Sequence, residues 1–247
     1  MIKFEMNTRN ISLIAVMSAL TCIATLVFQV YIPDTQGYFN VGEVAVYTSA
    51  LLFGPIIGGI SGGLGSAIAD LISGYSHYAI GTLIIKGIEG FIVGLIGLSI
   101  RKFSGNVLKL MAIIIALIAS STIYYIGATY YSGLMELSIG FPYLGYNTAS
   151  IFIPSIIWII PAIILFIFIT YTAIKADYKS VGYSIASLIG GIEMVIGYFL
   201  YEFHVLSFGW AALAEVPFNI CQMLVGTLIT PIIVKSIIKA IPIQFGG

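Results

Sequence analysis

Long apolar stretches dominate this sequence and decide what the chain can fold into. Six of them cover 10–31, 81–100, 108–130, 151–174, 182–203 and 212–238. A helix needs about 20 mostly apolar residues to cross the hydrocarbon core of a bilayer, which is roughly 30 Å thick. Only 8% of the 247 residues are charged, whereas a soluble domain carries roughly 25%. We therefore expect an all-α, polytopic membrane protein built as a bundle of transmembrane helices.

A seventh apolar stretch, 44–74, is interrupted at Gly54-Pro55. The positive charges decide how it crosses. Apart from Lys86, the Lys and Arg residues lie before residue 10 and within 101–109, 175–179 and 235–239. The remaining connections contain no Lys or Arg: 32–43, 75–80, 131–150 and 204–211.

By the positive-inside rule, the first set of connections is cytoplasmic and the second set is external. Stretch 44–74 therefore enters the membrane and returns, with its turn at Gly54-Pro55. This predicts about eight segments with both termini in the cytoplasm. Each limb of 44–74 is short for a full crossing, so two crossings and a re-entrant pair both remain open.

Glycines recur at helical spacing in two neighbouring segments. Gly54, Gly58 and Gly62 are four residues apart, and Gly87, Gly90, Gly94 and Gly97 follow in the next segment. Small residues at this spacing clear a face on which another backbone can pack closely. A close approach of the backbone to a ligand is the second interpretation.

Ionisable residues gather toward the outer ends of the segments: Glu43, Asp70, His77, Lys86, Glu89, Glu202, His204 and Glu215. Ionisable groups inside a bilayer are costly and are either functional or paired. Lys86 and Glu89 are three residues apart and can neutralise each other. Asp70 can cap a helix end or bond the loop 74–78. Glu43 and Glu202 can also lie in the headgroup region.

One helix face carries three polar residues. Glu215, Asn219 and Gln222 stand at i, i+4 and i+7, and hydrogen-bonding groups aligned in a membrane helix need partners. We interpret this face as part of a ligand pocket. Aromatic residues accompany it: Tyr38, Phe39, Tyr47, Tyr75, Tyr78, Tyr198, Tyr201, Phe208 and Trp210. They serve either as interfacial anchors or as walls for a flat, polar-edged molecule.

The sequence lacks the motifs of several other classes. It has no G-x-x-x-x-G-K-[ST] loop for ATP, no H-E-x-x-H and no G-x-S-x-G. Its two cysteines and two histidines form no cluster with metal-ligand spacing. The formal net charge is zero, which gives no reason to expect a nucleic-acid partner. We expect no enzyme activity, no cofactor and no bound metal.

Several motifs together resemble the substrate-binding S components of energy-coupling factor (ECF) vitamin transporters, particularly the riboflavin-type branch. They are Ala15-Val-Met-Ser-Ala19, Asn40-Val-Gly-Glu43, Leu52-Phe-Gly-Pro55, Gly65-Ser-Ala-Ile-Ala-Asp70, Thr82-Leu-Ile-Ile-Lys-Gly-Ile-Glu-Gly90, Gly197-Tyr-Phe-Leu-Tyr-Glu202 and Ala214-Glu-Val-Pro-Phe-Asn-Ile-Cys-Gln222. The resemblance covers 10–101 and 182–238, which hold six segments, the usual number in the family. We interpret 102–181 as a two-helix hairpin inserted into this core, within a single membrane domain 1–247.

The resemblance implies a module in the plasma membrane of a prokaryote that captures a vitamin-like molecule from outside. A separate transmembrane coupling subunit and ATPase subunits would supply the energy. Ala15 and Ala19 would dock on the coupling subunit, and the loop 32–43 would cover the substrate through Tyr38, Phe39 and Asn40. The other candidate binding residues are Glu43, Lys86, Glu89, Tyr201, Glu202, Glu215, Asn219 and Gln222.

Two other classes stay open. A stand-alone secondary transporter or permease often shows inverted repeats and a coupling-ion site near the membrane centre. We see no clear repeat, and only Glu193 lies that deep. A structural or assembly factor would bind no small molecule. For a binding module, the sequence leaves open a flavin, a pyridoxine-like ring and a thiamine-like cation.

Overall fold

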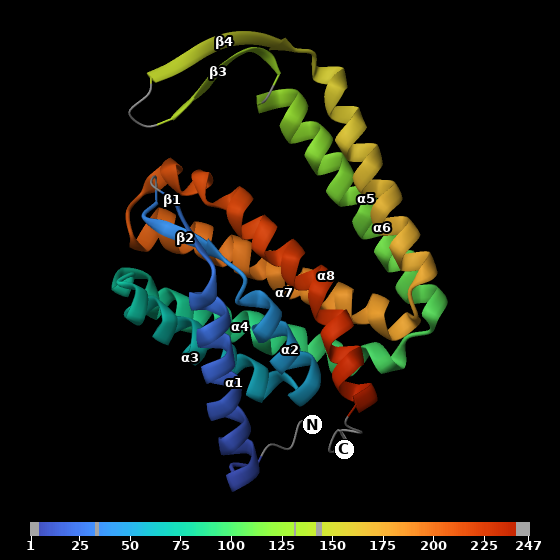
Figure 1. Ribbon diagram of the computed structural model, residues 1–247. Coiled ribbons are helices and arrows are strands. Elements are labelled where there is room, and N and C mark those ends of the chain that lie inside the picture. Colours follow the sequence, from blue (N-terminus) through green and yellow to red (C-terminus); the bar gives the residue numbers. More distant parts are fainter. Residues whose placement is uncertain (1–4, 33–34, 131, 142–144, 241–247) are drawn as a thin grey trace. The chain divides into compact units, whose positions relative to one another are not determined.

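A computed structural model describes residues 5–32, 35–130, 132–141 and 145–240 (Figure 1). They divide into two compact units. The first unit contains the described residues up to 104 and from 179 onward, and the second contains 105–178. Each unit has its own packing and is described separately below.

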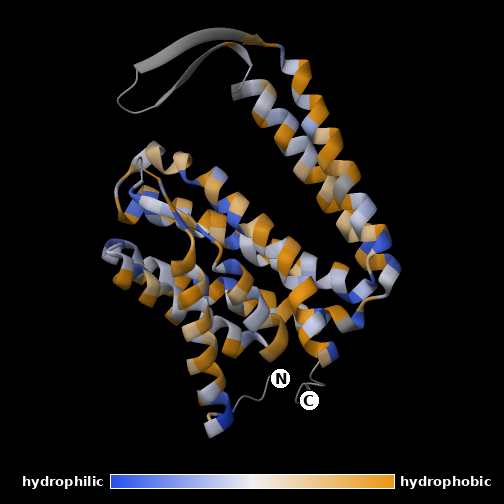
Figure 2. Cartoon of the chain, in the orientation of Figure 1, coloured by the Kyte–Doolittle hydropathy of each residue, from blue (hydrophilic) through white to orange (hydrophobic). Residues whose placement is uncertain are grey.

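The first unit is a bundle of mostly long, apolar helices. They are α1 (Thr8–Val27), α2 (Glu43–Phe53), α3 (Pro55–Ser73), α4 (Ser76–Ser99), α7 (Tyr178–Leu200) and α8 (Val216–Ala240), with the short turns η1 (Ile100–Lys102), η3 (Tyr201–Val205) and η4 (Gly209–Ala214). Except for α2, these helices are long and apolar enough to cross a membrane, and Figure 2 shows apolar residues along most of their lengths. The prediction of a polytopic helical bundle is confirmed.

Helices α2 and α3 turn at Gly54-Pro55, as the sequence predicts. Gly54 has φ 89°, a conformation that residues with a side chain rarely adopt, and Pro55 occupies the first position of α3. Helix α2 has 11 residues, which span about 16 Å at 1.5 Å per residue. That is roughly half the thickness of the hydrocarbon core. By its length, α2 does not cross a membrane alone.

The glycines pack α2, α3 and α4 closely together, which confirms the packing interpretation. A Cβ atom on Gly58 would lie 2.4 Å from the Cα of Ala50 in α2. A Cβ on Gly94 would lie 2.5 Å from the backbone nitrogen of Pro55. Neither distance is sterically tolerable, so only glycine allows these backbones to approach so closely.

The helix ends of the first unit alternate between two sides. The α3–α4 turn and the η3–η4 connection meet at one end, where the Tyr201 hydroxyl donates to the His77 carbonyl oxygen at 2.8 Å. The α2–α3 turn, the start of α1 and the end of α8 lie at the other end (Figure 1). Lys102, Lys235 and Lys239 belong to this second end. The alternation agrees with the order of sides deduced from the positive charges.

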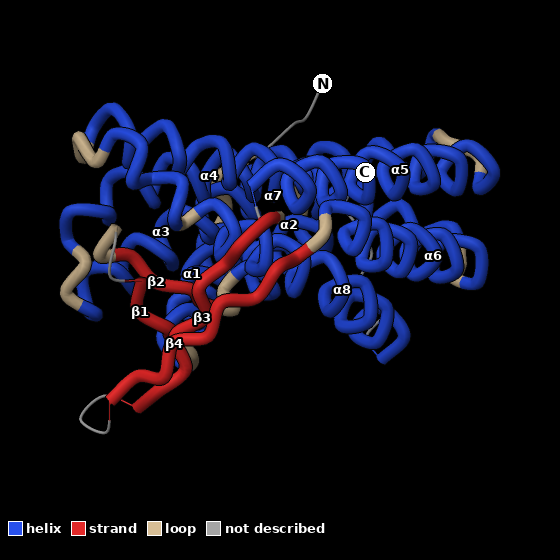
Figure 3. The backbone as a smooth tube through the Cα atoms, turned by 90° about the horizontal axis from the view of Figure 1, so that it is seen from above, coloured by secondary structure: helices blue, strands red, loops and turns tan. Residues whose placement is uncertain are grey.

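A short β-hairpin corrects the sequence-based boundaries after the first helix. Helix α1 stops at Val27, whereas the sequence predicts a segment that continues to residue 31. Strands β1 (Gln29–Ile32) and β2 (Gly37–Asn40) pair antiparallel, with Gln29 opposite Asn40. Val30, Tyr31 and Ile32 are β-branched or aromatic, which favours a strand over a helical end. Figure 3 shows the hairpin across the ends of the neighbouring helices.

The second unit is a helical hairpin whose connection forms strands. It contains α5 (Gly105–Tyr130), β3 (Gly133–Phe141), β4 (Gly145–Ile153), η2 (Ser155–Trp158) and α6 (Ile159–Lys175). Strands β3 and β4 are antiparallel, with Gly133 opposite Ile153. The Trp158 ring packs on Gly127, where a Cβ would lie 2.1 Å away. Both apolar segments are helical, but 151–153 belong to β4 and not to a helix. The interpretation of 102–181 as an insertion stays a prediction.

A compact group of side chains joins three helices of the first unit. Tyr78 and Ile85 of α4 are buried against Met194 and Tyr198 of α7 and against Met223 of α8. Met194 is fully buried. This packing fixes the facing surfaces of three helices, and it therefore fixes the positions of the polar residues on those surfaces.

Candidate ligand-binding site

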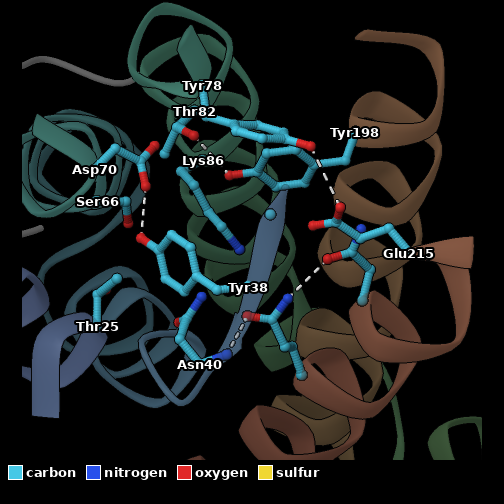
Figure 4. A pocket seen from close by; sticks show the side chains of 13 residues that line it. Thr25, Tyr38, Asn40, Ser66, Asp70, Tyr78, Thr82, Lys86, Tyr198 and Glu215 are labelled. Carbon is cyan, nitrogen blue, oxygen red and sulfur yellow. Dashed lines mark hydrogen bonds between the residues drawn. The ribbon is translucent and has the colours of Figure 1, made fainter. Parts of the chain in front are cut away.

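A polar cavity lies inside the first unit, beneath the β1–β2 hairpin (Figure 4). It is lined by Thr25, Gly37, Tyr38, Asn40, Ser66, Asp70, Tyr78, Thr82, Lys86, Tyr198, Glu215, Asn219 and Gln222. These residues come from α1, β2, α3, α4 and α7 and from the η4–α8 region. Polar side chains concentrated inside a membrane bundle are typical of a functional site.

The hairpin closes the cavity through three hydrogen bonds to different helices. The Tyr38 hydroxyl donates to Asp70 Oδ1 of α3 at 2.5 Å. The Asn40 backbone N–H donates to Gln222 Oε1 of α8 at 3.0 Å. The Tyr78 hydroxyl of α4 donates to the Thr35 carbonyl oxygen, between the strands, at 3.0 Å. Residues 35–40 therefore form a lid that is attached on three sides.

The environment of Tyr38 keeps its hydroxyl protonated. Burial raises the pKa of this phenol, and the neighbouring Asp70 carboxylate raises it further. A phenol already titrates far above neutral pH. Tyr38 is therefore a stable hydrogen-bond donor, and Asp70 is its natural acceptor.

Lys86 of α4 is the centre of a buried charge cluster. Its Nζ donates to Glu43 at the start of α2 and to Glu89 Oε2 at 3.0 Å. The Tyr47 hydroxyl donates to Glu89 Oε1 at 2.8 Å. The neutralisation that the spacing of Lys86 and Glu89 suggests is therefore present, with Glu43 as a second partner. Lys86 still lines the cavity, so its pairing does not remove it from the site.

Two glutamates meet at the opposite side of the cavity. The Tyr78 hydroxyl lies 3.4 Å from Glu202 Oε1 and 3.3 Å from Glu215 Oε2. Gly37 of the lid faces Glu215 so closely that a Cβ would lie 2.5 Å from each of its carboxylate oxygens. A side chain at position 37 would therefore have to displace this carboxylate for the lid to keep its place.

Tyrosine rings form much of the remaining wall. The rings of Tyr78 and Tyr198 have their centroids 6.4 Å apart. The Tyr198 hydroxyl donates to Thr82 Oγ1 at 3.0 Å, which fixes the orientation of its ring. Lys86 Nζ stands 5.6 Å from the centroid of the Tyr198 ring, within the range of a cation–π contact.

The structure brings together many of the residues singled out in the sequence. Six of the candidate binding residues line the cavity: Tyr38, Asn40, Lys86, Glu215, Asn219 and Gln222. Asn219 Oδ1 accepts from Gln222 Nε2 at 2.7 Å, so the predicted helix face is internally bonded. Their role in binding a substrate stays a prediction.

The other candidates lie outside the lining. The carboxylates of Glu43 and Glu89 accept hydrogen bonds from the Lys86 ammonium. Glu202 lies beside the Tyr78 hydroxyl. Phe39 packs edge-on against Phe28, with ring centroids 6.1 Å apart. The Tyr201 hydroxyl donates to the His77 carbonyl oxygen, next to the α3–α4 turn.

Four lining residues are missing from the sequence-based set: Thr25, Gly37, Ser66 and Thr82. The sequence singles out Tyr78 and Tyr198 as possible aromatic walls, and Asp70 as one of the clustered ionisable residues. Helical spacing contains a signal for Thr82, which precedes Lys86 by four residues and shares its face of α4. The sequence offers Asp70 as a helix cap or as a partner of the loop 74–78. Its backbone oxygen accepts from Tyr75 N at 2.8 Å, but its carboxylate accepts from the Tyr38 hydroxyl and lines the cavity.

The first helix presents the proposed docking residues outward. Ala15 and Ala19 are exposed, whereas Met17, Ser18 and Thr21 form the buried face of α1. The small residues are therefore accessible to a partner helix. Docking itself stays a prediction.

The fold and the cavity define a class: a multi-pass membrane protein with a polar cavity closed by a lid. Comparison with known proteins gives the family. The family model for the S component of ECF-type riboflavin transporters matches residues 5–179. The chain belongs to this family, as its motifs suggest. The match includes most of 102–181 and ends near the start of α7.

Two curated relatives match shorter parts of the chain. The "Thiamine precursor transporter HmpT" of Lactococcus lactis subsp. cremoris (strain MG1363) is 34% identical over 90 residues, which is 36% of this chain and 54% of the relative. An "Uncharacterized protein in gap 3'region" of Pyrococcus woesei is 50% identical over 72 residues, or 29% of this chain and 48% of the relative. The chain thus matches about half the length of each relative.

Proposed function

We propose that this chain is the substrate-capture subunit of an ATP-driven importer in a prokaryotic plasma membrane, and that it binds a small vitamin-like molecule from the outer side. The observation that carries this proposal is the lidded cavity, whose polar lining comes from five helices and one strand. Membership in an S-component family supports it. A separate coupling subunit and ATPase subunits supply the energy in this proposal.

The closed cavity sets a condition on binding. Its volume is about 20 Å³, enough for about one water molecule, whereas sites for small organic ligands measure roughly 300–1,000 Å³. A vitamin-sized molecule therefore requires residues 35–40 to move outward. The lid is held by hydrogen bonds from Tyr38, Asn40 and Tyr78, which must break for it to move.

The names of the similar proteins suggest two chemistries for the ligand. The family is named for riboflavin, and the Lactococcus relative for a thiamine precursor. Both are flat nitrogen heterocycles with polar edges, which suits a cavity with tyrosine walls and amide, carboxylate and ammonium groups.

The direct test is to purify the protein in detergent and to identify co-purifying small molecules by mass spectrometry. The proposal expects a heterocyclic metabolite, whose amount falls when Asn219 and Gln222 are both changed to Ala. Both side chains line the cavity. A preparation that contains no such molecule and binds none of a vitamin panel would overturn the proposal.

A stand-alone secondary transporter is the second candidate. The observation that favours it is Glu193 on α7, whose Oε2 is buried without a hydrogen-bond partner in the described structure. Such a group can take part in coupling to an ion or a proton. Purified protein in liposomes distinguishes the two: uptake driven by an ion gradient supports this candidate, and uptake only with coupling and ATPase subunits supports the S-component proposal.

A further inference from the structure

The charges around the cavity do not balance. Five carboxylates are buried there, with exposed fractions of 4% or less: Glu43, Asp70, Glu89, Glu202 and Glu215. Of the described residues that line the cavity, Lys86 alone carries a positive charge. The cavity therefore has a marked excess of potential negative charge.

The ammonium of Lys86 is already engaged. It bonds both Glu43 and Glu89, so two carboxylates share one positive charge. Asp70, Glu202 and Glu215 remain, and we call these three residues the acidic wall. Among the described residues, no ion pair involves any member of the acidic wall. The histidines nearest in sequence, His77 and His204, are exposed.

Neutral hydroxyl groups provide bonds to these residues, and the Glu202 and Glu215 carboxyl groups also bond each other. Tyr38 donates to Asp70, and Tyr78 is shared between Glu202 and Glu215. Asp70 Oδ2 and Glu202 Oε2 are buried and have no hydrogen-bond partner in the described structure. Asp70 is 3% exposed and lines the cavity, so an unsatisfied acceptor belongs to the cavity wall itself.

A buried carboxylate without a cation is unfavourable, and a hydroxyl donor compensates only part of the lost hydration. Such a group either holds a proton or is stabilised by binding a positive charge. The acidic wall therefore does not stabilise the protein without a ligand. It is well suited to a ligand that brings a cation or several N–H donors.

The aromatic wall favours the same kind of ligand. Tyr38, Tyr78 and Tyr198 all line the cavity, and the faces of their rings attract positive charge. Figure 4 shows the rings of Tyr78 and Tyr198 beside each other, with Tyr38 and Asp70 bonded nearby. A flat ring that carries positive charge can contact an aromatic face and a carboxylate at the same time.

We propose that the ligand of this cavity is a positively charged nitrogen heterocycle, whose cationic or N–H edge binds the acidic wall. This inference rests on the proposed function, and it selects one ligand class from those that the sequence leaves open. A neutral flavin would leave the acidic wall without a cation, and an anionic ligand would add to the repulsion.

The test uses two probes and charge-neutral variants of the full chain in detergent. Thiamine is a permanent cation with an aminopyrimidine ring, and riboflavin is a neutral flavin. Affinity for each is measured by isothermal titration calorimetry with the wild type, Asp70→Asn, Glu215→Gln and the double variant, since Asp70 and Glu215 are the members of the acidic wall that line the cavity. Asn and Gln keep the sizes of Asp and Glu and remove the charge. Glu193→Gln is the matched control, because Glu193 is a membrane carboxylate that does not line the cavity.

The proposal expects thiamine to bind more tightly than riboflavin. It also expects each cavity substitution to weaken thiamine binding at least about tenfold, the loss expected of one charge-assisted hydrogen bond. Glu193→Gln should change the affinity for thiamine less than twofold. Tighter binding of riboflavin, or thiamine binding that is unchanged in the double variant, would overturn the cationic ligand and leave the proposed function intact.

Mass spectrometry decides the case in which neither probe binds. If a co-purifying molecule is cationic at neutral pH and is lost from the double variant, the inference holds. A neutral or anionic molecule overturns the inference alone. If no molecule co-purifies, the proposed function and the inference fall together.

Discussion

The hydroxyl of Tyr38 in β2 donates a hydrogen bond of 2.5 Å to Asp70 Oδ1 in α3, and both residues line the cavity. The same contact thus holds the lid and orients a potential ligand-binding carboxylate. The described residues 29–32 and 35–40 have few other side-chain bonds to the bundle, such as that from Gln29 Nε2 to Ser73 Oγ at 3.0 Å. Loss of the Tyr38 hydroxyl should therefore change how long the lid stays closed.

We predict that Tyr38→Phe speeds ligand association about tenfold, because a hydrogen bond to a charged group contributes roughly 1.5–3 kcal/mol and this bond must break before a ligand enters. The dissociation rate should change less. Stopped-flow or surface-based kinetics with the co-purified ligand would measure both rates. Tyr31→Phe is the control, since Tyr31 lies opposite Tyr38 in the same hairpin and is exposed. Equal association rates for the two variants would contradict a latch role for Tyr38.

The contact of Gly37 with Glu215 gives a second prediction. A Cβ at position 37 would lie 2.5 Å from both carboxylate oxygens of Glu215. Gly37→Ala should therefore push the Glu215 carboxylate away from its position in the cavity and weaken ligand binding about tenfold, while the helical bundle still forms. Gly87→Ala is the matched control, because its nearest atom would be 3.7 Å away. Wild-type affinity in Gly37→Ala would show that the lid does not rest on Glu215 in the bound protein.

Lys86 should be important for stability as well as for binding. Lys86→Met leaves Glu43 and Glu89 buried without their cation, which we expect to cost about 3–5 kcal/mol. For a chain of this length, the melting temperature in detergent should fall by roughly 6–20 °C. Differential scanning fluorimetry measures this directly.

A triple variant without the unpaired carboxylates tests whether their charge causes this loss of stability. Adding Glu43→Gln and Glu89→Gln to Lys86→Met removes the unpaired charges and should restore much of the lost stability. Lys102→Met, at an exposed position, should have little effect. If the triple variant is no more stable than Lys86→Met, then lost packing and not unpaired charge explains the destabilisation.

The sequence predicted the helical part of this fold well because the signals there are local. Apolar length identifies the long helices, and the alternation of positive charge requires a turn at Gly54-Pro55. The β1–β2 hairpin was not predicted, because Val30 to Ile32 continue an apolar run that also reads as a helix. Short apolar runs do not distinguish a strand from a helical end.

The site was only partly predictable for a different reason. Asn219 and Gln222 share a face with Glu215, and helical spacing shows this without a structure. Thr25 and Ser66 line the cavity only because α1 and α3 turn those faces inward, which depends on tertiary packing. Phe39 and Tyr201 carry suitable side chains beside the site, yet they pack against Phe28 and His77.

The orientation in the membrane is testable with single cysteines. In a background with Cys22→Ala and Cys221→Ala, we predict that Ser207→Cys in the η3–η4 connection reacts with a membrane-impermeant maleimide on intact cells. Lys102→Cys should react only after the cells are opened, because positively charged connections stay in the cytoplasm. Both positions are exposed, so accessibility within the fold does not bias the comparison. The opposite labelling pattern would place the lid on the cytoplasmic side and contradict capture from outside.

The outward face of α1 gives the last prediction. Ala15 and Ala19 are exposed in a stripe of small residues on which another helix can pack closely. Leu at both positions should abolish co-purification with the coupling subunit, because the larger side chains keep the backbones apart, while ligand affinity remains within about twofold of wild type. Ala211→Leu, an exposed alanine in η4, should leave the complex intact. If the double variant loses ligand binding together with the complex, α1 supports the fold, and its outward face is not a separate docking surface.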